Sequence, residues 1–223
     1  MRFAPSSLTP TRIVVSLIVT VGLCTRSTPA ADPTELTIED PFATVDGDPV
    51  TIAHLNLLIN QRFGPKVVTA ATPQLRQAAA LMLVRQQLAF RSLTKSDAGA
   101  QRIGTAAVAD AIARAKRRGT SLTDIAAAAS ANVRAIEADV RFKAVWQDYL
   151  SRNLSEENLR RFFNSNPKPY GVDAFDELTD LRRIKSDATA KMFAVLVQRS
   201  RDAQVQWIDE TLRPPAGVNL FEP

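Results

Sequence analysis

Hydrophobic residues recur at helical spacing along most of this chain, and the pattern is clearest in residues 133–163. At about 100° per residue, the first part of this segment has two apolar faces and only a narrow polar strip. One face carries Val133, Ile136, Val140 and Ala144, and the other carries Ala138, Phe142, Val145 and Tyr149. A helix that is apolar on two sides needs neighbours on both. The pattern predicts the central helix of a helical domain, although periodicity alone also fits an ordinary core helix of any all-α protein.

The segment before this helix divides into helices at recognisable cap residues. Thr51 is a suitable N-cap for a helix that ends at Gly64-Pro65. Thr72-Pro73 then opens a long apolar helix that reaches about Leu93, because proline suits the first helical position. His54 falls in the first turn of the earlier helix and is interpreted as an exposed or hydrogen-bonded side chain, with a ligand or base as the alternative.

Further N-cap residues predict where three more helices begin. Ser96-Asp97 begins a helix in which we expect a break or kink near Gly104, because glycine destabilises a helix interior. Basic residues 116–118 close that helix before Gly119, where capping is favoured over phosphate binding. Ser121 begins a short alanine-rich helix, and Asn132 caps the central helix.

Two segments alternate between apolar and polar residues and are predicted to be strands. Ala43, Val45 and Val50 flank Asp46-Gly47, a pair typical of a tight hairpin turn. Residues 202–208 alternate again and are expected to pair with the 43–50 segment, which would join the two ends of the fold. The predicted fold class is mostly α, an irregular helical bundle with a small β-ribbon formed near 43–50 and 203–208.

The first 30 residues have the pattern of a secretory signal. Arg2 and Arg12 precede an apolar run over residues 13–24, and Thr28 and Ala30 supply small residues before a cut at Ala31. The run is shorter than the ~20 residues that span a bilayer, with an uncleaved anchor as the alternative. We therefore expect export to a bacterial periplasm. Loss of the three arginines in this segment lowers the formal net charge from +5 to +2, which gives no reason to expect nucleic acid as a partner.

The composition leaves little room for reactive chemistry. The chain has one Cys and one His, whereas a structural zinc site takes about four N or S ligands and a nucleophilic dyad needs a placed imidazole. No metal or other cofactor is expected. Paired carboxylates could perform acid–base catalysis, but no supporting motif accompanies them, and several suit the first turn of a helix. The residues considered were Glu156, Glu157, Asp173, Asp176, Glu177 and Asp180.

Four short sequence motifs follow one another in an order that resembles the N-terminal chaperone region of SurA-like periplasmic peptidyl-prolyl isomerases. The matching phrases are residues 43–51 (ATVDGDPVT), 93–98 (LTKSDA), 119–125 (GTSLTDI) and 154–163 (LSEENLRRFF). Such proteins continue into a parvulin domain with a His-containing pocket. Here a turn-rich bridge follows instead, and the only His or Cys after Ala31 is His54. The resemblance implies the chaperone fold without the isomerase pocket.

The resemblance also implies an organisation for the whole chain. A long helix carrying Leu178 to Val197 would return to pack on the N-terminal helices, and whether an apolar groove lies between them is left open. The predicted parts are a signal peptide (1–30), a flexible arm (31–41), a SurA-like helical chaperone region (42–166), a short bridge in place of a parvulin domain (167–175), a C-terminal helix and strand (176–213) and a tail (214–223).

The favoured function is a non-catalytic, exported chaperone that binds extended apolar segments of unfolded polypeptides. Such a protein needs exposed apolar surface rather than reactive groups. Two alternatives stay open: a divergent peptidyl-prolyl isomerase, and an adaptor with one dedicated partner. No membrane span is expected after signal removal, and the oligomeric state is left open. The candidate peptide-binding residues are Phe142, Trp146, Tyr149, Phe162, Phe163 and Tyr170, with Trp207 as a further candidate and core membership as the alternative for each.

Overall fold

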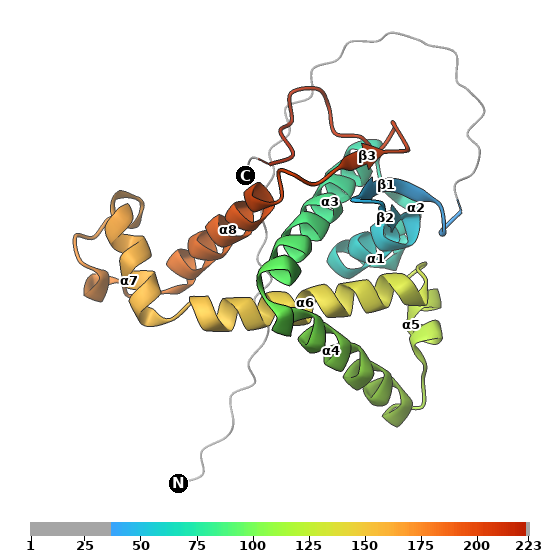
Figure 1. Cartoon of the computed structure of the whole chain (residues 1–223), viewed down its shortest axis with the longest axis horizontal. Helices are drawn as coiled ribbons and strands as arrows, with labels where there is room; N and C mark the ends of the chain where they lie inside the picture. The colour runs from blue at the N-terminus through green and yellow to red at the C-terminus, as the bar shows by residue number, and fades with distance from the viewer. Residues whose placement is uncertain (1–36, 222–223) are drawn as a thin grey trace. The chain divides into compact units, whose positions relative to one another are not determined.

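The computed structural model describes residues 37–221, and these residues form a mostly helical fold with one small antiparallel sheet (Figure 1). The predicted signal peptide and the first part of the predicted arm lie outside the described residues. None of the helices in the described part of the chain combines the length and the apolar character that a bilayer crossing requires.

The sheet joins segments from both ends of the described chain. Strand β1 (Pro41–Val45) pairs with β2 (Asp48–Thr51) through a turn at Asp46 and Gly47. These two residues have φ values of 52° and 86°, as a two-residue hairpin turn requires. Strand β3 (Val205–Trp207) pairs antiparallel with the other side of β1, which gives the order β2-β1-β3. The predicted ribbon and its third strand are confirmed.

Most of the helices begin directly after a predicted cap residue. Thr72 Oγ1 accepts a hydrogen bond from Leu75 N, and Asn132 Oδ1 accepts one from Ala135 N at 2.8 Å. The helices are α1 (Ile52–Phe63), α2 (Pro65–Ala70), α3 (Pro73–Ser96), α4 (Ala98–Arg117), α5 (Leu122–Ala128), α6 (Val133–Asn153), α7 (Glu156–Ser165) and α8 (Arg182–Arg199), with two short 3₁₀ helices, η1 (Lys168–Tyr170) and η2 (Phe175–Glu177).

The expected break near Gly104 is wrong, because α4 runs through this residue without interruption. Gly104 is buried, and a Cβ atom added there would lie 3.4 Å from Cβ and Cγ of Arg141 on α6. The glycine therefore permits a close approach of α4 to α6. The close packing offsets the intrinsic cost of glycine in a helix.

Two boundaries in the predicted organisation also need correction. Residues 37–40 form a turn tied to α1, because Asp40 O accepts from Ile52 N and Ile38 O accepts from Ala53 N. The C-terminal helix begins at Arg182 rather than near 176, and the preceding residues form η1, η2 and turns. Asp176 and Glu177 therefore lie in η2 and Asp180 lies in the following turn, not in the first turn of a long helix.

The core consists of three hydrophobic clusters. The main cluster joins the sheet to α1, α3, the middle of α6 and the end of α8, with Phe42, Leu55 and Leu88 fully buried. A second cluster packs α1 against α5, the end of α4 and the start of α6. A third links α7, η2 and the start of α8 around Phe163 and Ile184. As predicted, α6 is a central element, since it contacts α1, α3, α4 and α5.

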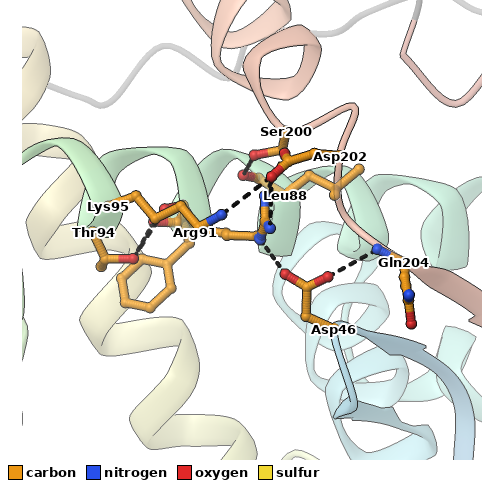
Figure 2. A network of polar contacts seen from close by, with 9 residues as sticks. Asp46, Leu88, Arg91, Thr94, Lys95, Ser200, Asp202 and Gln204 are labelled. Atoms are coloured by element: carbon orange, nitrogen blue, oxygen red, sulfur yellow. Dashed lines mark hydrogen bonds and ion pairs between the residues drawn. The ribbon is translucent and has the colours of Figure 1, made fainter.

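A polar network ties the hairpin turn and the C-terminal segment to α3 (Figure 2). Arg91 on α3 forms ion pairs with Asp46 in the turn and with Asp202 after α8, the latter at 2.9 Å. Asp46 N donates to Gln204 O, and Gln204 N donates to Asp46 Oδ1, both at 2.8 Å. These contacts, together with the β1–β3 pairing, hold the two ends of the described chain side by side. We call these residues the clasp.

Candidate functional site

A half-open groove of about 360 Å³ lies between β2, α1, α3 and α6. Its volume falls within the range of small-ligand sites, roughly 300–1,000 Å³. The groove is lined by Asp48, Pro49 and Val50 from β2, His54, Leu57 and Leu58 from α1, Leu83, Gln86, Gln87 and Phe90 from α3, and Arg134, Ala135, Glu137, Ala138, Asp139, Arg141 and Phe142 from α6.

The apolar part of the lining belongs to the cores of the fold. Leu57 belongs to the second cluster, whereas Val50 and Leu58 belong to the main cluster, and all three are buried. Leu83 and Phe142 pack against the main cluster but stay partly exposed. The groove therefore has an apolar floor that the core holds in place, with charged and amide side chains around it.

The groove continues into a second, more polar cavity of about 340 Å³. The two cavities share four lining residues, Asp48, Gln87, Phe90 and Arg141. The second cavity extends along α3 towards Thr94 and along the near side of α4 at Gln101, Gly104 and Thr105. An elongated ligand could thus lie across both cavities.

His54 is the only imidazole of the chain, and it lies on the wall of the groove. Its Nδ1 accepts a hydrogen bond from Thr51 N at 3.2 Å and lies 2.9 Å from Thr51 Oγ1. The side chain at the third helical position thus satisfies the backbone N–H of the cap residue, as Glu or Gln does in a capping box. Burial lowers the pKa of His54 below its usual 6.5, although the charges of Asp139 and Glu39 act in the opposite direction.

The charges around the groove are largely balanced. Asp139 Oδ2 accepts from Lys143 Nζ at 2.7 Å and from Gln61 Nε2 at 2.9 Å. Glu137 faces Arg141 at 3.5 Å, which is a loose pair. With both signs present and several groups already paired, the groove does not select strongly for a charged ligand.

Three of the predicted binding residues form an aromatic row along α6. The Phe142 and Trp146 rings are nearly parallel with centroids 6.5 Å apart, and the Trp146 and Tyr149 centroids are 5.7 Å apart. Phe142 lines the groove, whereas Trp146 lies against Phe193 of α8 in an edge-on contact. All three side chains are partly buried, so the row is half core and half surface.

The other three predicted residues lie in the third cluster, away from the groove lining. Phe163 is 1 % exposed, so its side chain is a core residue and is not accessible to a ligand. Phe162 and Tyr170 pack against the same cluster and are partly buried. The Tyr170 hydroxyl donates to Asp187 at 3.0 Å, and burial together with this bond raises its pKa to about 12. Trp207 stacks on Phe42 in the sheet.

The sequence interpretation missed most of the groove. Val50, Leu57, Leu58 and Leu83 were not among the candidate binding residues, and His54 was set aside as an exposed or hydrogen-bonded residue. One signal was present: Leu83, Gln86, Gln87 and Phe90 follow helical spacing and form a stripe with apolar ends and amides between. Such a stripe is typical of a helix face that lines a partly open surface.

The two cavities do not lie beside the C-terminal helix. The sequence left open whether an apolar groove separates the N-terminal helices from the 178–197 helix, and α8 contributes no lining residue to either cavity. Instead, α8 packs against α3 and buries Leu196 and Val197 in the main cluster. The space between these helices is filled by core side chains.

The first cavity lacks several of the side chains that commonly act as nucleophiles. Neither Ser, Cys nor Lys lines the first cavity, and the single imidazole already uses Nδ1 for a helix cap. Within residues 37–221, no group of three or more His, Cys, Asp or Glu side chains is placed to hold a metal ion. The carboxylates Glu156 and Asp176 are both paired with Arg160 at the surface.

A comparison of the chain with protein-family models found no match, and comparisons with curated proteins and with solved structures found none either.

Proposed function

We propose that this protein binds extended apolar segments of unfolded polypeptides in the groove between β2, α1, α3 and α6, without chemical conversion of the ligand. The observation that carries the proposal is the groove itself. Leu57, Leu83 and Phe142 present apolar surface within a half-open cavity whose floor belongs to the core. An apolar lining with a few polar groups is typical of a binding site.

The continuation into a second cavity supports an extended ligand. A compact apolar molecule would occupy the first cavity alone, whereas a polypeptide segment could also place polar backbone near Gln87, Thr94 and Gln101. The mixed rim charges suit ligands of varied sequence. Partly exposed Leu83 on α3 adds apolar surface to the groove.

Recognition through side chains fits this groove better than strand addition. β2 is an edge strand beside the groove, but Pro49 at its centre has no N–H to offer a ligand strand. The ligand would therefore gain affinity by burying apolar side chains rather than by extending the sheet.

The cellular setting is part of the proposal. The leader pattern in residues 1–30 and the order of phrases in residues 43–163 support an exported, SurA-like chaperone. Residues 167–175 form η1 and turns that pack on the third cluster. This segment is a short link, where SurA-like isomerases have a parvulin domain.

Suppression of aggregation tests this function. α-Lactalbumin, which aggregates when dithiothreitol reduces its disulfides, serves as the unfolded client. Its light scattering is followed with increasing amounts of the purified protein. We expect suppression by the wild-type chain and a loss of about tenfold or more in potency for Leu83→Asp, because a charge in the apolar floor is costly to desolvate.

Ile112→Asp is the matched control, since Ile112 is 48 % exposed on α4 and lies outside the groove. It should suppress aggregation as the wild type does. Equal activity of both variants would reject the groove as the binding site. Acceleration of a proline-limited refolding reaction would favour the isomerase alternative, and capture of one stoichiometric partner would favour the adaptor.

A further inference from the structure

We infer that His54 Nε2–H is a fixed hydrogen-bond donor for a backbone carbonyl of the bound polypeptide. The inference rests on the proposed function and names the polar contact that orients the ligand in its groove. It starts from the only imidazole of the chain, which lines the apolar cavity beside Leu57 and Leu58.

The hydrogen bond at Nδ1 decides which ring nitrogen carries the proton. A backbone N–H can only donate, so the Thr51 N–H to Nδ1 contact requires Nδ1 to accept. In the neutral ring the proton then lies on Nε2. Because Nδ1 is turned towards Thr51 at the start of α1, Nε2 is the nitrogen that remains for a ligand.

Within residues 37–221, Nε2 has no hydrogen-bond partner, and the nearby carboxylates are occupied. The two whose charges reach the ring are Asp139 and Glu39. Asp139 is bound by Gln61 and Lys143, and Glu39 Oε1 accepts from Asn132 Nδ2 at 2.9 Å. The remaining charged groups along the groove are Asp48, Arg134, Glu137 and Arg141.

A neutral donor in an apolar cavity suits a neutral acceptor. A carbonyl oxygen of the peptide backbone is present at every residue of a ligand, whatever its side chains. One fixed donor can therefore orient many sequences, while the apolar floor binds their side chains. The capping box holds the ring in place, so little conformational freedom is lost when the ligand binds.

The single imidazole makes a direct test feasible. Protein labelled with ¹⁵N-histidine and carrying no histidine tag gives one pair of ring nitrogen signals. It is titrated with two unlabelled decapeptides whose central residues are Leu, Val and Phe in different orders. We expect the free protein to show the Nε2–H tautomer, and the Nε2 signal to shift saturably with both peptides.

Two variants separate the donor from the helix cap. His54→Glu keeps an acceptor for Thr51 N but removes the donor, and we expect about three- to tenfold weaker binding of a fluorescein-labelled decapeptide. His54→Gln keeps both functions and should bind within about twofold of the wild type. Thermal melts by circular dichroism confirm that both variants are folded.

The outcomes distinguish this inference from the proposed function. Saturable binding by the wild type with no shift at Nε2, or with equal affinity of His54→Glu, overturns the role of His54 and leaves the function standing. If the Nε2 signal shifts with only one of the two decapeptides, His54 does not recognise the peptide backbone. Absence of any binding by the folded wild type overturns the proposed function and this inference together.

Discussion

At the scale of single residues, a helix N-cap forms within a few positions of the chain, whereas the burial of a side chain depends on distant elements. Thr72, Ser121 and Asn132 act as N-caps as the sequence indicated, because a cap interacts only with residues two or three positions away. His54 is different. Its bond to Thr51 is local, but its burial depends on α6, which lies about 80 positions further along the chain.

The partly buried imidazole predicts a dependence of stability on pH. The pKa of His54 is lowered in the folded protein, so the unfolded chain takes up the proton first as the pH falls. The stabilising effect of the neutral ring is present above about pH 6.5 and is lost at lower pH. We expect the urea midpoint of the wild type to fall between about pH 7 and pH 5.

His54→Gln supplies the control, because glutamine caps the helix without titrating. Its urea midpoint should change less over the same pH interval. A profile as steep as that of the wild type would mean that the ring does not lose its charge on folding, and it would contradict the hydrogen bond from Thr51 N.

At the scale of elements, the sequence identified the main helices and strands but misjudged what glycine does in α4. The expected kink treated Gly104 as a defect of its own helix. Its role is set by Arg141 on α6, and a single helix carries no sign of its partner. The start of α8 was misplaced for a similar reason, since Leu178 and Leu181 pack on the third cluster as apolar residues without being helical.

Contact between α3 and α8 gives a prediction for Ser200, which is fully buried. Its hydroxyl donates to Leu88 O at 2.9 Å (Figure 2). Ser200→Ala should lower the free energy of unfolding by about 1 kcal/mol. Ser186→Ala, at an exposed position on α8, should change it by less than about 0.5 kcal/mol. Equal urea midpoints for the two variants would contradict this packing of α8 on α3.

The clasp predicts a second effect of pH. Hydrogen bonds from the Gln204 backbone and from Arg91 lower the pKa of Asp46, and hydrogen bonds from Arg91 and Lys95 lower that of Asp202. Both carboxylates therefore stabilise the fold above about pH 4, and the effect is lost as the pH falls further.

Arg91→Met removes the cation that the two carboxylates share. We expect a smaller loss of stability between about pH 5 and pH 3 than in the wild type, measured by urea unfolding. Arg102→Met is the matched control, since Arg102 is exposed on α4 and forms no ion pair in the described part of the chain. An acid profile unchanged by Arg91→Met would contradict the clasp.

At the scale of the whole molecule, the pairing of residues 202–208 with the 43–50 segment was predictable, because residues 202–208 alternate between apolar and polar as a strand does. The groove was not predictable, because four elements distant in sequence form it. The aromatic residues were chosen because a small core was not expected to bury all of them. That reasoning does not distinguish Phe142 at the groove from Phe163 in the third cluster.

Both tryptophans pack on the main cluster, Trp146 from α6 and Trp207 from β3. If the two ends unfold together, Trp146→Phe and Trp207→Phe should each show a fluorescence transition that coincides with the loss of helical circular dichroism in urea. A transition at lower urea for the variant that retains Trp207 would show that the C-terminal strand detaches first.

The central claim is that the groove between β2, α1, α3 and α6 holds an extended apolar peptide. Photo-cross-linking with a decapeptide that carries a benzophenone group, followed by mass spectrometry, tests this claim most directly. We predict cross-links to groove residues such as Leu57, Leu83 and Phe142, reduced by excess unlabelled peptide. Cross-links that concentrate on α7 and the start of α8, or that spread evenly over the surface, would contradict it.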